Sequence, residues 1–151
     1  CSKEEAKITL TGVDDKPGVA AAIFGPLSES GINVDMIIQN ISENNSTDLT
    51  FSCPSSQVLE AEEAIKMASK KKEISFKTHI IDTNVAKVSL VGIGMRSHTG
   101  IAKKMFEALA SENINILVIS TSEIKISILV EQKYMELAVR SLHDAFGLQN
   151  I

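Results

Sequence analysis

The chain has 151 residues, of which 44% are hydrophobic and 23% charged, and its formal net charge at pH 7 is −4. This composition is ordinary for a globular protein with a buried core, and the length suits one domain or two small ones. Scattered basic residues and the lack of a long apolar run argue against a nucleic-acid footprint and a membrane span. No signal peptide opens the chain, and Cys1 and Cys53 form no CxxC pair, which favours a cytoplasmic protein with reduced thiols.

The first predicted elements are a strand over residues 7–11, a turn at Gly12, and a helix over about residues 17–30. We expect Asp15 to cap the helix and Pro17 to lie in its first turn. The free N–H groups at such a helix end attract an anion, and the carboxylate beside them attracts a cation. A free amino acid carries both charges, although a plain strand-to-helix turn has the same pattern.

Four further elements complete this half of the chain. They are strands over residues 33–41 and 48–53, a helix that follows Pro54, and a strand over residues 74–80. The order βαββαβ predicts an α+β, ferredoxin-like unit with its helices on one face of an antiparallel sheet. Pro26 is expected to kink the first helix, because proline removes one helical hydrogen bond.

The second half of the chain repeats the first. The segment 6–12 returns as 86–92, and the segment 18–20 returns as 100–102. Self-similarity at this period indicates two copies of one supersecondary unit. The expected elements of the second copy are strands over residues 87–91, 115–121 and 123–131, a helix over about residues 99–112, and a helix that ends at Gly147.

We predict the two units at residues 1–81 and 82–151. The second unit lacks a fourth strand. By the logic of the repeat, that strand lies directly before Lys7 and upstream of Cys1. The chain is therefore expected to be a piece of a longer protein, or to leave one sheet edge open.

Six segments resemble one known family. They are Asp15–Gly18, Asn33–Asn40 and Thr47–Phe51 in the first unit, and Val88–Gly92, Met95–His98 and Ser120–Ser127 in the second. In this order and at this spacing they resemble the tandem ACT domains of aspartate kinase. Thr99, where the family often has proline, is a minor departure.

The resemblance implies the regulatory half of aspartate kinase, or the separate small subunit that some bacteria make, without the kinase part. In that family the ACT pair binds end-product amino acids, here threonine or lysine or both, and inhibits aspartate phosphorylation in lysine, threonine and methionine biosynthesis. We therefore expect no enzymatic activity of the chain alone and no cofactor. The expected partners are a second copy, bound through the ACT units, and the kinase domain or catalytic subunit; nucleic acid and membrane are not expected.

The resemblance also implies an effector site. Its main part is the turn of the first unit, which comprises Asp15, Lys16, Pro17, Gly18, Val19 and Ala20. Gln39 would point its amide at the same place, and Asn115 and Ile116 of a second protomer would close the site, with Ser122 nearby. A second effector loop would comprise Met95, Ser97, His98, Thr99 and Gly100. That loop has no carboxylate matching Asp15, so it should prefer a different ligand.

No catalytic or metal site is predicted, because the three histidines share no ligand spacing and no nucleophile–base pair is readable. Two other functions stay open: a stand-alone ACT sensor for another enzyme, and a βαββαβ RNA-binding module with aromatic residues on its sheet. The identity of the amino acid is open as well. Lysine would need an extra carboxylate, for which Asp35, Asp48 and Glu123 are candidates.

Overall fold

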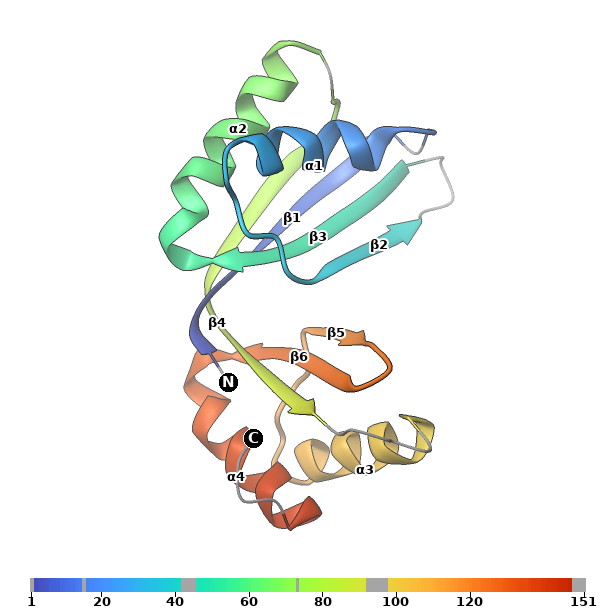
Figure 1. Ribbon diagram of the computed structural model, residues 1–151, viewed down its shortest axis with the longest axis vertical. Coiled ribbons are helices and arrows are strands. Elements are labelled where there is room, and N and C mark those ends of the chain that lie inside the picture. Colours follow the sequence, from blue (N-terminus) through green and yellow to red (C-terminus); the bar gives the residue numbers. More distant parts are fainter. Residues whose placement is uncertain (1, 15, 42–45, 73, 92–97, 148–151) are drawn as a thin grey trace. The chain divides into compact units, whose positions relative to one another are not determined.

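The computed structural model describes residues 2–14, 16–41, 46–72, 74–91 and 98–147, without the side chains of residues 2, 3, 41, 98 and 99. The chain divides into two compact units. The first unit is Glu4–Thr83, and the second is Asn84–Ile151 together with Cys1–Lys3. Each unit combines antiparallel strands with two helices, which confirms the predicted fold class (Figure 1).

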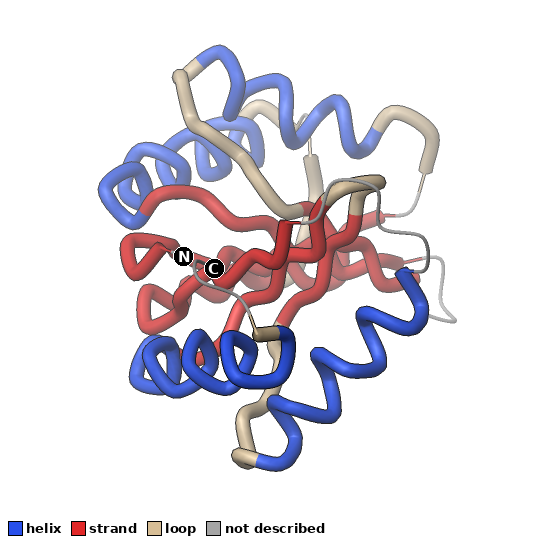
Figure 2. The backbone as a smooth tube through the Cα atoms, turned by 60° about the horizontal axis from the view of Figure 1, so that its bottom comes forward, coloured by secondary structure: helices blue, strands red, loops and turns tan. Residues whose placement is uncertain are grey.

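The first unit is a four-stranded antiparallel sheet with both helices on one face (Figure 2). Its strand order is β2-β3-β1-β4. Its elements are β1 (Ser2–Asp14), α1 (Val19–Glu29), β2 (Ile37–Ile41), β3 (Ser46–Pro54), the 3-10 turn η1 (Ser55–Gln57), α2 (Val58–Lys70) and the start of β4 (Thr78–Val91).

The second unit repeats this arrangement with the strand order β4-β6-β5. Its elements are the end of β4, α3 (His98–Ser111), β5 (Val118–Thr121), β6 (Lys125–Glu131), the 3-10 turn η2 (Gln132–Tyr134) and α4 (Met135–Phe146). As predicted, α4 ends at Gly147, which adopts the left-handed conformation that closes many helices (φ 64°).

The repeat extends to the backbone after the first helix of each unit. Gly31 (φ 76°) and Asn113 (φ 57°) are both left-handed. The following residues, Ile32 and Ile114, each donate an N–H to the carbonyl five residues back, at 3.0 Å in both units. Glycine and asparagine are the residues that tolerate this conformation best, so two different residue types end the helix in the same way.

The strands depart from the prediction most clearly at β4. The sequence predicts separate strands over residues 74–80 and 87–91, but the structure has one strand of 14 residues, Thr78–Val91. No glycine or proline interrupts residues 81–86, and Val85 and Ala86 are fully buried and pair with β6. The expected break was therefore wrong: the polar run Asp82-Thr83-Asn84 favours a turn locally, but the pairing of Val85 and Ala86 with β6 and their burial outweigh it.

The other strands differ in their ends. β1 begins at Ser2, before the expected start at residue 7, and residues 1–3 belong to the second compact unit. The expected strand before Lys7 therefore lies partly within this chain. β2 and β5 begin at Ile37 and Val118, later than predicted. The turn at residues 44–46 falls mostly outside the described residues.

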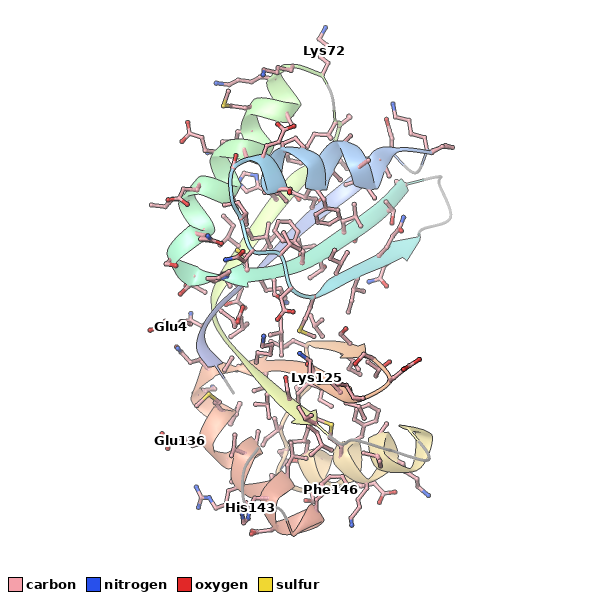
Figure 3. All side chains as sticks on the ribbon, viewed as in Figure 1. Glu4, Lys72, Lys125, Glu136, His143 and Phe146 are labelled. Carbon is pink, nitrogen blue, oxygen red and sulfur yellow. The ribbon has the colours of Figure 1, made fainter. Side chains whose placement is uncertain are left out.

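The second hairpin turns later than expected, because β6 begins at Lys125 and not at residue 123. Ser122 donates its N–H to the carbonyl of Lys125 at 2.7 Å, so Glu123 and Ile124 form the turn between them. Figure 3 labels Lys125 at the start of β6.

Each unit has its own hydrophobic core between helices and sheet. The first is built around the fully buried side chains of Ile8, Leu10, Ile23, Leu27 and Phe51. The second contains Val88, Met105, Leu109, Ile128 and Leu142. The alternation of apolar residues along the strands and their helical spacing in α1 and α3 explain why these side chains face one another.

One polar contact ties α2 to β4 beside the first core. Glu62 Oε2 lies 2.9 Å from His79 Nε2, and Glu62 Oε1 lies 3.6 Å from Lys66 Nζ. The hydrogen bond from His79 and the charge of Lys66 lower the pKa of the Glu62 carboxyl. The carboxylate form is therefore favoured in the folded protein.

We predict that this contact makes the first unit sensitive to acid. Because the carboxyl pKa is lower in the folded state, the stabilisation is complete above its ordinary value and is lost as the pH falls through the lowered value. Glu62→Gln should reduce the free energy of unfolding near pH 6 by less than about 1 kcal/mol and flatten its decline at acid pH. Urea unfolding at pH 3 to 7 measures both, with Glu63→Gln as the control; equal slopes for the two variants would contradict the prediction.

Candidate functional site

The candidate site is the turn between β1 and α1. Lys16 donates its N–H to the carbonyl of Asp14 at 3.1 Å, and Val19 donates to the carbonyl of Lys16 at 3.2 Å. Gly18 precedes the helix in the left-handed conformation (φ 87°). The sequence predicts Pro17 in the first turn of the helix, but the helix starts at Val19. Pro17 therefore lies before the cap residue Gly18, and this prediction was wrong. The expected role of Asp15 as the cap falls outside the described residues.

The first turn of α1 offers free hydrogen-bond donors. Ala22 makes the first helical bond, to the carbonyl of Gly18 at 3.0 Å, and the N–H groups of Ala20 and Ala21 have no acceptor within the helix. The cap residue Gly18 has no side chain that could accept from them. Gly18 and Ala20 are exposed, so these donors and the positive end of the helix dipole are accessible to an anion.

The conformation of Gly18 explains why the turn is open. An added Cβ at this position would have no described atom within 4 Å, so no described group packs against this side of Gly18. A positive φ is easy only for glycine. The sequence Pro17-Gly18 therefore both directs the chain into the helix and keeps its end uncovered.

Gln39 is placed on the same side of the sheet as this turn. It pairs with Leu49, which pairs in turn with Leu10, and both leucines lie in the core under the helices. Directly paired residues share a face of the sheet, so Gln39 lies on the helix-covered side. On β3, the partner of Gln39 is Leu49, and the partner of Asp14, where the turn begins, is Ser46. These two partners are three residues apart, or about 10 Å along the strand. A glutamine side chain and a bound amino acid together can span that distance.

The predicted residues of the second unit flank β5. Asn115 is exposed and Ile116 half-buried, in the loop that enters the strand. Ser122 follows the other end of β5. Seven extended residues span roughly 20 Å, so Asn115 and Ser122 of one chain do not contact the same small ligand. Asn115 and Ile116 precede β5, and Ser122 lies at its opposite end.

The second effector loop falls mostly outside the described residues. Met95 and Ser97 are among the omitted residues, and the side chains of His98 and Thr99 are not described. α3 begins at His98, and Gly100 is exposed in its first turn. A ligand at this loop stays a prediction.

The aromatic side chains do not form a stacking surface. Phe24, Phe51 and Phe76 pack in the first core, and Phe106, Tyr134 and Phe146 pack against the second. Phe24 and Phe51 meet edge to face, with ring centroids 5.6 Å apart. These are all the aromatic residues of the chain. The polar face of each sheet therefore lacks the aromatic platform that single-stranded RNA requires.

Other chemistry finds no support in the described part of the chain. No group of three or more histidine, cysteine, aspartate or glutamate side chains is arranged to hold a metal ion there. Burial and the nearby Glu5 raise the pKa of the Cys53 thiol to about 11, so it stays protonated and unreactive near neutral pH. Within the described residues, no helix is both long and apolar enough to cross a membrane.

Lys77 is the residue near the turn that sequence reasoning missed. Its N–H donates to the carbonyl of Thr11 at 2.7 Å, close to where β1 approaches the turn. Lys77 and Thr11 are separated by 66 positions, and a lysine before a strand carries no signal of such a contact.

The sequence did single out Asp48, as a candidate carboxylate for the side chain of a bound lysine. In the structure, Asp48 Oδ1 accepts the N–H of Gly12 at 3.1 Å.

We predict that the shape of the turn depends on Gly18. Gly18→Ala should destabilise the protein by about 1 to 2 kcal/mol, because it forces a residue with a Cβ into the left-handed region. Gly25→Ala is the matched control, since Gly25 lies inside α1 with nothing within 4 Å of an added Cβ and should be neutral or stabilising. Thermal unfolding measures both, and equal shifts would contradict the prediction.

Two family models match the chain. Both describe an ACT domain, one over residues 7–66 and the other over residues 88–146. Among curated proteins, an aspartokinase of Pseudomonas aeruginosa is 54% identical over 147 residues, which is 97% of this chain and 35% of that protein. The chain thus spans about a third of the length of the curated relatives it matches.

Two solved structures match over nearly their whole length. The crystal structure of aspartokinase alpha and beta subunits has a TM-score of 0.87 and 47% identity, and covers 97% of this chain and 95% of that one. The ligand-free regulatory subunit of aspartate kinase from Thermus thermophilus has a TM-score of 0.86 and 40% identity, and covers 95% and 93%.

Proposed function

Because this chain belongs to the tandem ACT regulatory regions of aspartokinases, we propose that it binds an end-product amino acid, threonine or lysine, and thereby inhibits the kinase. The kinase domain is not part of the 151 residues, so the chain regulates and does not catalyse. The exposed end of α1, where the cap residue Gly18 makes no side-chain hydrogen bond, is the single observation that carries this proposal.

The binding mode follows from the charges at the turn. The α-carboxylate of the effector accepts from the free N–H groups of Ala20 and Ala21, and the helix dipole favours its negative charge. Asp15 supplies the opposite charge for the ammonium group. Gln39 contributes an amide from the edge strand on the same side of the sheet. The carboxylate and the ammonium group of the effector thus each have a partner of opposite charge or a hydrogen-bond donor.

A second protomer would complete the site with Asn115 and Ile116. β2 and β5 are edge strands of their units in the described structure, and an edge strand can pair with another chain. Ile37 on β2 is 51% exposed and Ile119 on β5 is 40% exposed, so both edges carry apolar surface. Inhibition then requires that the effector bind one arrangement of the protomers more tightly than the other.

A stand-alone sensor for another enzyme is the second candidate, and it shares this binding site. RNA binding is disfavoured, because every aromatic side chain packs against a core and the net charge is −4.

We predict that Asp15 holds the ammonium group. Asp15→Asn should weaken binding of threonine or lysine at least tenfold, or about 1.4 kcal/mol, because a neutral amide cannot balance the charge. Glu29→Gln removes the same charge at the far end of α1, about 16 Å along the helix from its start, and should leave affinity within twofold. Titration calorimetry with each amino acid measures the effect; absence of binding of both to the unaltered chain would overturn the proposal.

We also predict that the edge of the first unit supports protomer pairing. Ile37→Lys places a charge on β2 and should lower the dimer fraction, measured by sedimentation at micromolar concentration. Leu59→Lys is the control, because Leu59 is 76% exposed on α2 and away from the edge strand. An equal dimer fraction for both variants would argue against pairing through β2.

A further inference from the structure

The strand that leads to the candidate site contains a bulge at Gly12. The register of β1 against β3 shifts between Leu10 and Val13. Gly12 lies within the shift with a φ of +64°, a conformation that other residues rarely adopt. Val13 is fully buried in the first core, and Asp14 ends the strand at the start of the turn. The path of the bulge therefore decides where the turn begins.

Two neighbours hold Gly12 from outside β1. Asp48 Oδ1, on β3, accepts the N–H of Gly12 at 3.1 Å. Lys77, the residue before β4, donates its N–H to the carbonyl of Thr11 at 2.7 Å. The side chain of Lys77 also covers Gly12, since a Cβ added there would lie 2.7 Å from Lys77 Cγ and 2.8 Å from its Cδ.

The contact between Gly12 and Lys77 is specific among the described glycines. Gly18, Gly25, Gly31 and Gly147 have no atom within 4 Å of an added Cβ, whereas Gly12 has three within 3.1 Å. Among these five glycines, Gly12 is thus the one at which close approach, and not only backbone conformation, disfavours a side chain. The apolar stem of a lysine can pack in this way while its ammonium stays in water.

We propose that Lys77 is a positioning residue for the effector turn, acting through its stem on Gly12. This inference rests on the proposed function, because it assumes that the turn binds an amino acid. The stem and the N–H of Lys77 fix the bulge, the bulge fixes the start of the turn, and the turn aims the free donors of α1. A displacement of about 1 Å is enough to weaken hydrogen bonds to a small ligand.

The test combines four variants in the complete 151-residue chain, each titrated with L-threonine and with L-lysine. Lys77→Ala removes the stem and should weaken binding three- to tenfold while thermal unfolding shifts by only about 2 °C or less. Lys77→Met keeps an unbranched stem and should bind within twofold of the unaltered chain. Gly12→Ala should weaken binding more than tenfold, because its methyl group collides with Lys77.

The double variant separates positioning from stability. Adding Lys77→Ala to Gly12→Ala removes the two closest atoms, Cγ and Cδ, but leaves the Cβ at 3.1 Å and the positive φ of residue 12, so affinity should recover only in part toward that of Lys77→Ala alone. Gly31→Ala is the matched control, since Gly31 also has a positive φ but has open space around it. It should lower the unfolding temperature and leave affinity unchanged.

The outcomes are distinguishable. Unchanged affinity in Lys77→Ala, or equal losses of affinity in Lys77→Ala and Lys77→Met, overturns the positioning role of Lys77. If Gly12→Ala does not fold, the pair Lys77→Ala and Lys77→Met still decides the question, because Lys77 is exposed. Failure of the unaltered chain to bind either amino acid overturns the proposed function, and this inference falls with it.

Discussion

The left-handed backbone of Gly18 is the constraint on which the candidate site depends. It lets the chain turn from the end of β1 into α1 through a cap residue that has no side chain. A serine or aspartate at the cap would satisfy the first N–H groups from within the protein and leave fewer for a ligand. Gly18 has no such side chain, and in the proposed binding mode the carboxylate of the effector would accept from the same N–H groups.

Much of the fold could be predicted because the sequence carries two copies of one pattern. The alternation of Ile8 and Leu10 recurs in Val88 and Leu90, and all four side chains are buried. What failed were the ends of elements. β4 runs through the predicted gap although Asp82, Thr83 and Asn84 favour a turn, and α1 starts after Pro17 because Gly18 occupies the cap. Local propensity indicates where an element lies, but hydrogen bonds to neighbouring strands decide where it stops.

The site was predictable to the extent that it follows from local sequence. The Pro-Gly turn and the helix after it are adjacent in the chain, so their geometry could be anticipated from the residues. The role of Gln39 could be predicted only from the family resemblance, because its position depends on the register of β2 with β3. Lys77 could not be found at all, since its contact with Gly12 joins distant positions and follows from the backbone path of a bulge.

The continuity of β4 has a consequence for any attempt to study the halves apart. Domains joined by a flexible linker can be cut in the linker and prepared separately. Here the boundary between Thr83 and Asn84 falls inside a single strand, so no such linker exists at that point. A cut there would leave each fragment with a frayed strand end and unpaired amide and carbonyl groups. A fragment of either repeat should therefore keep the whole of β4, Thr78–Val91.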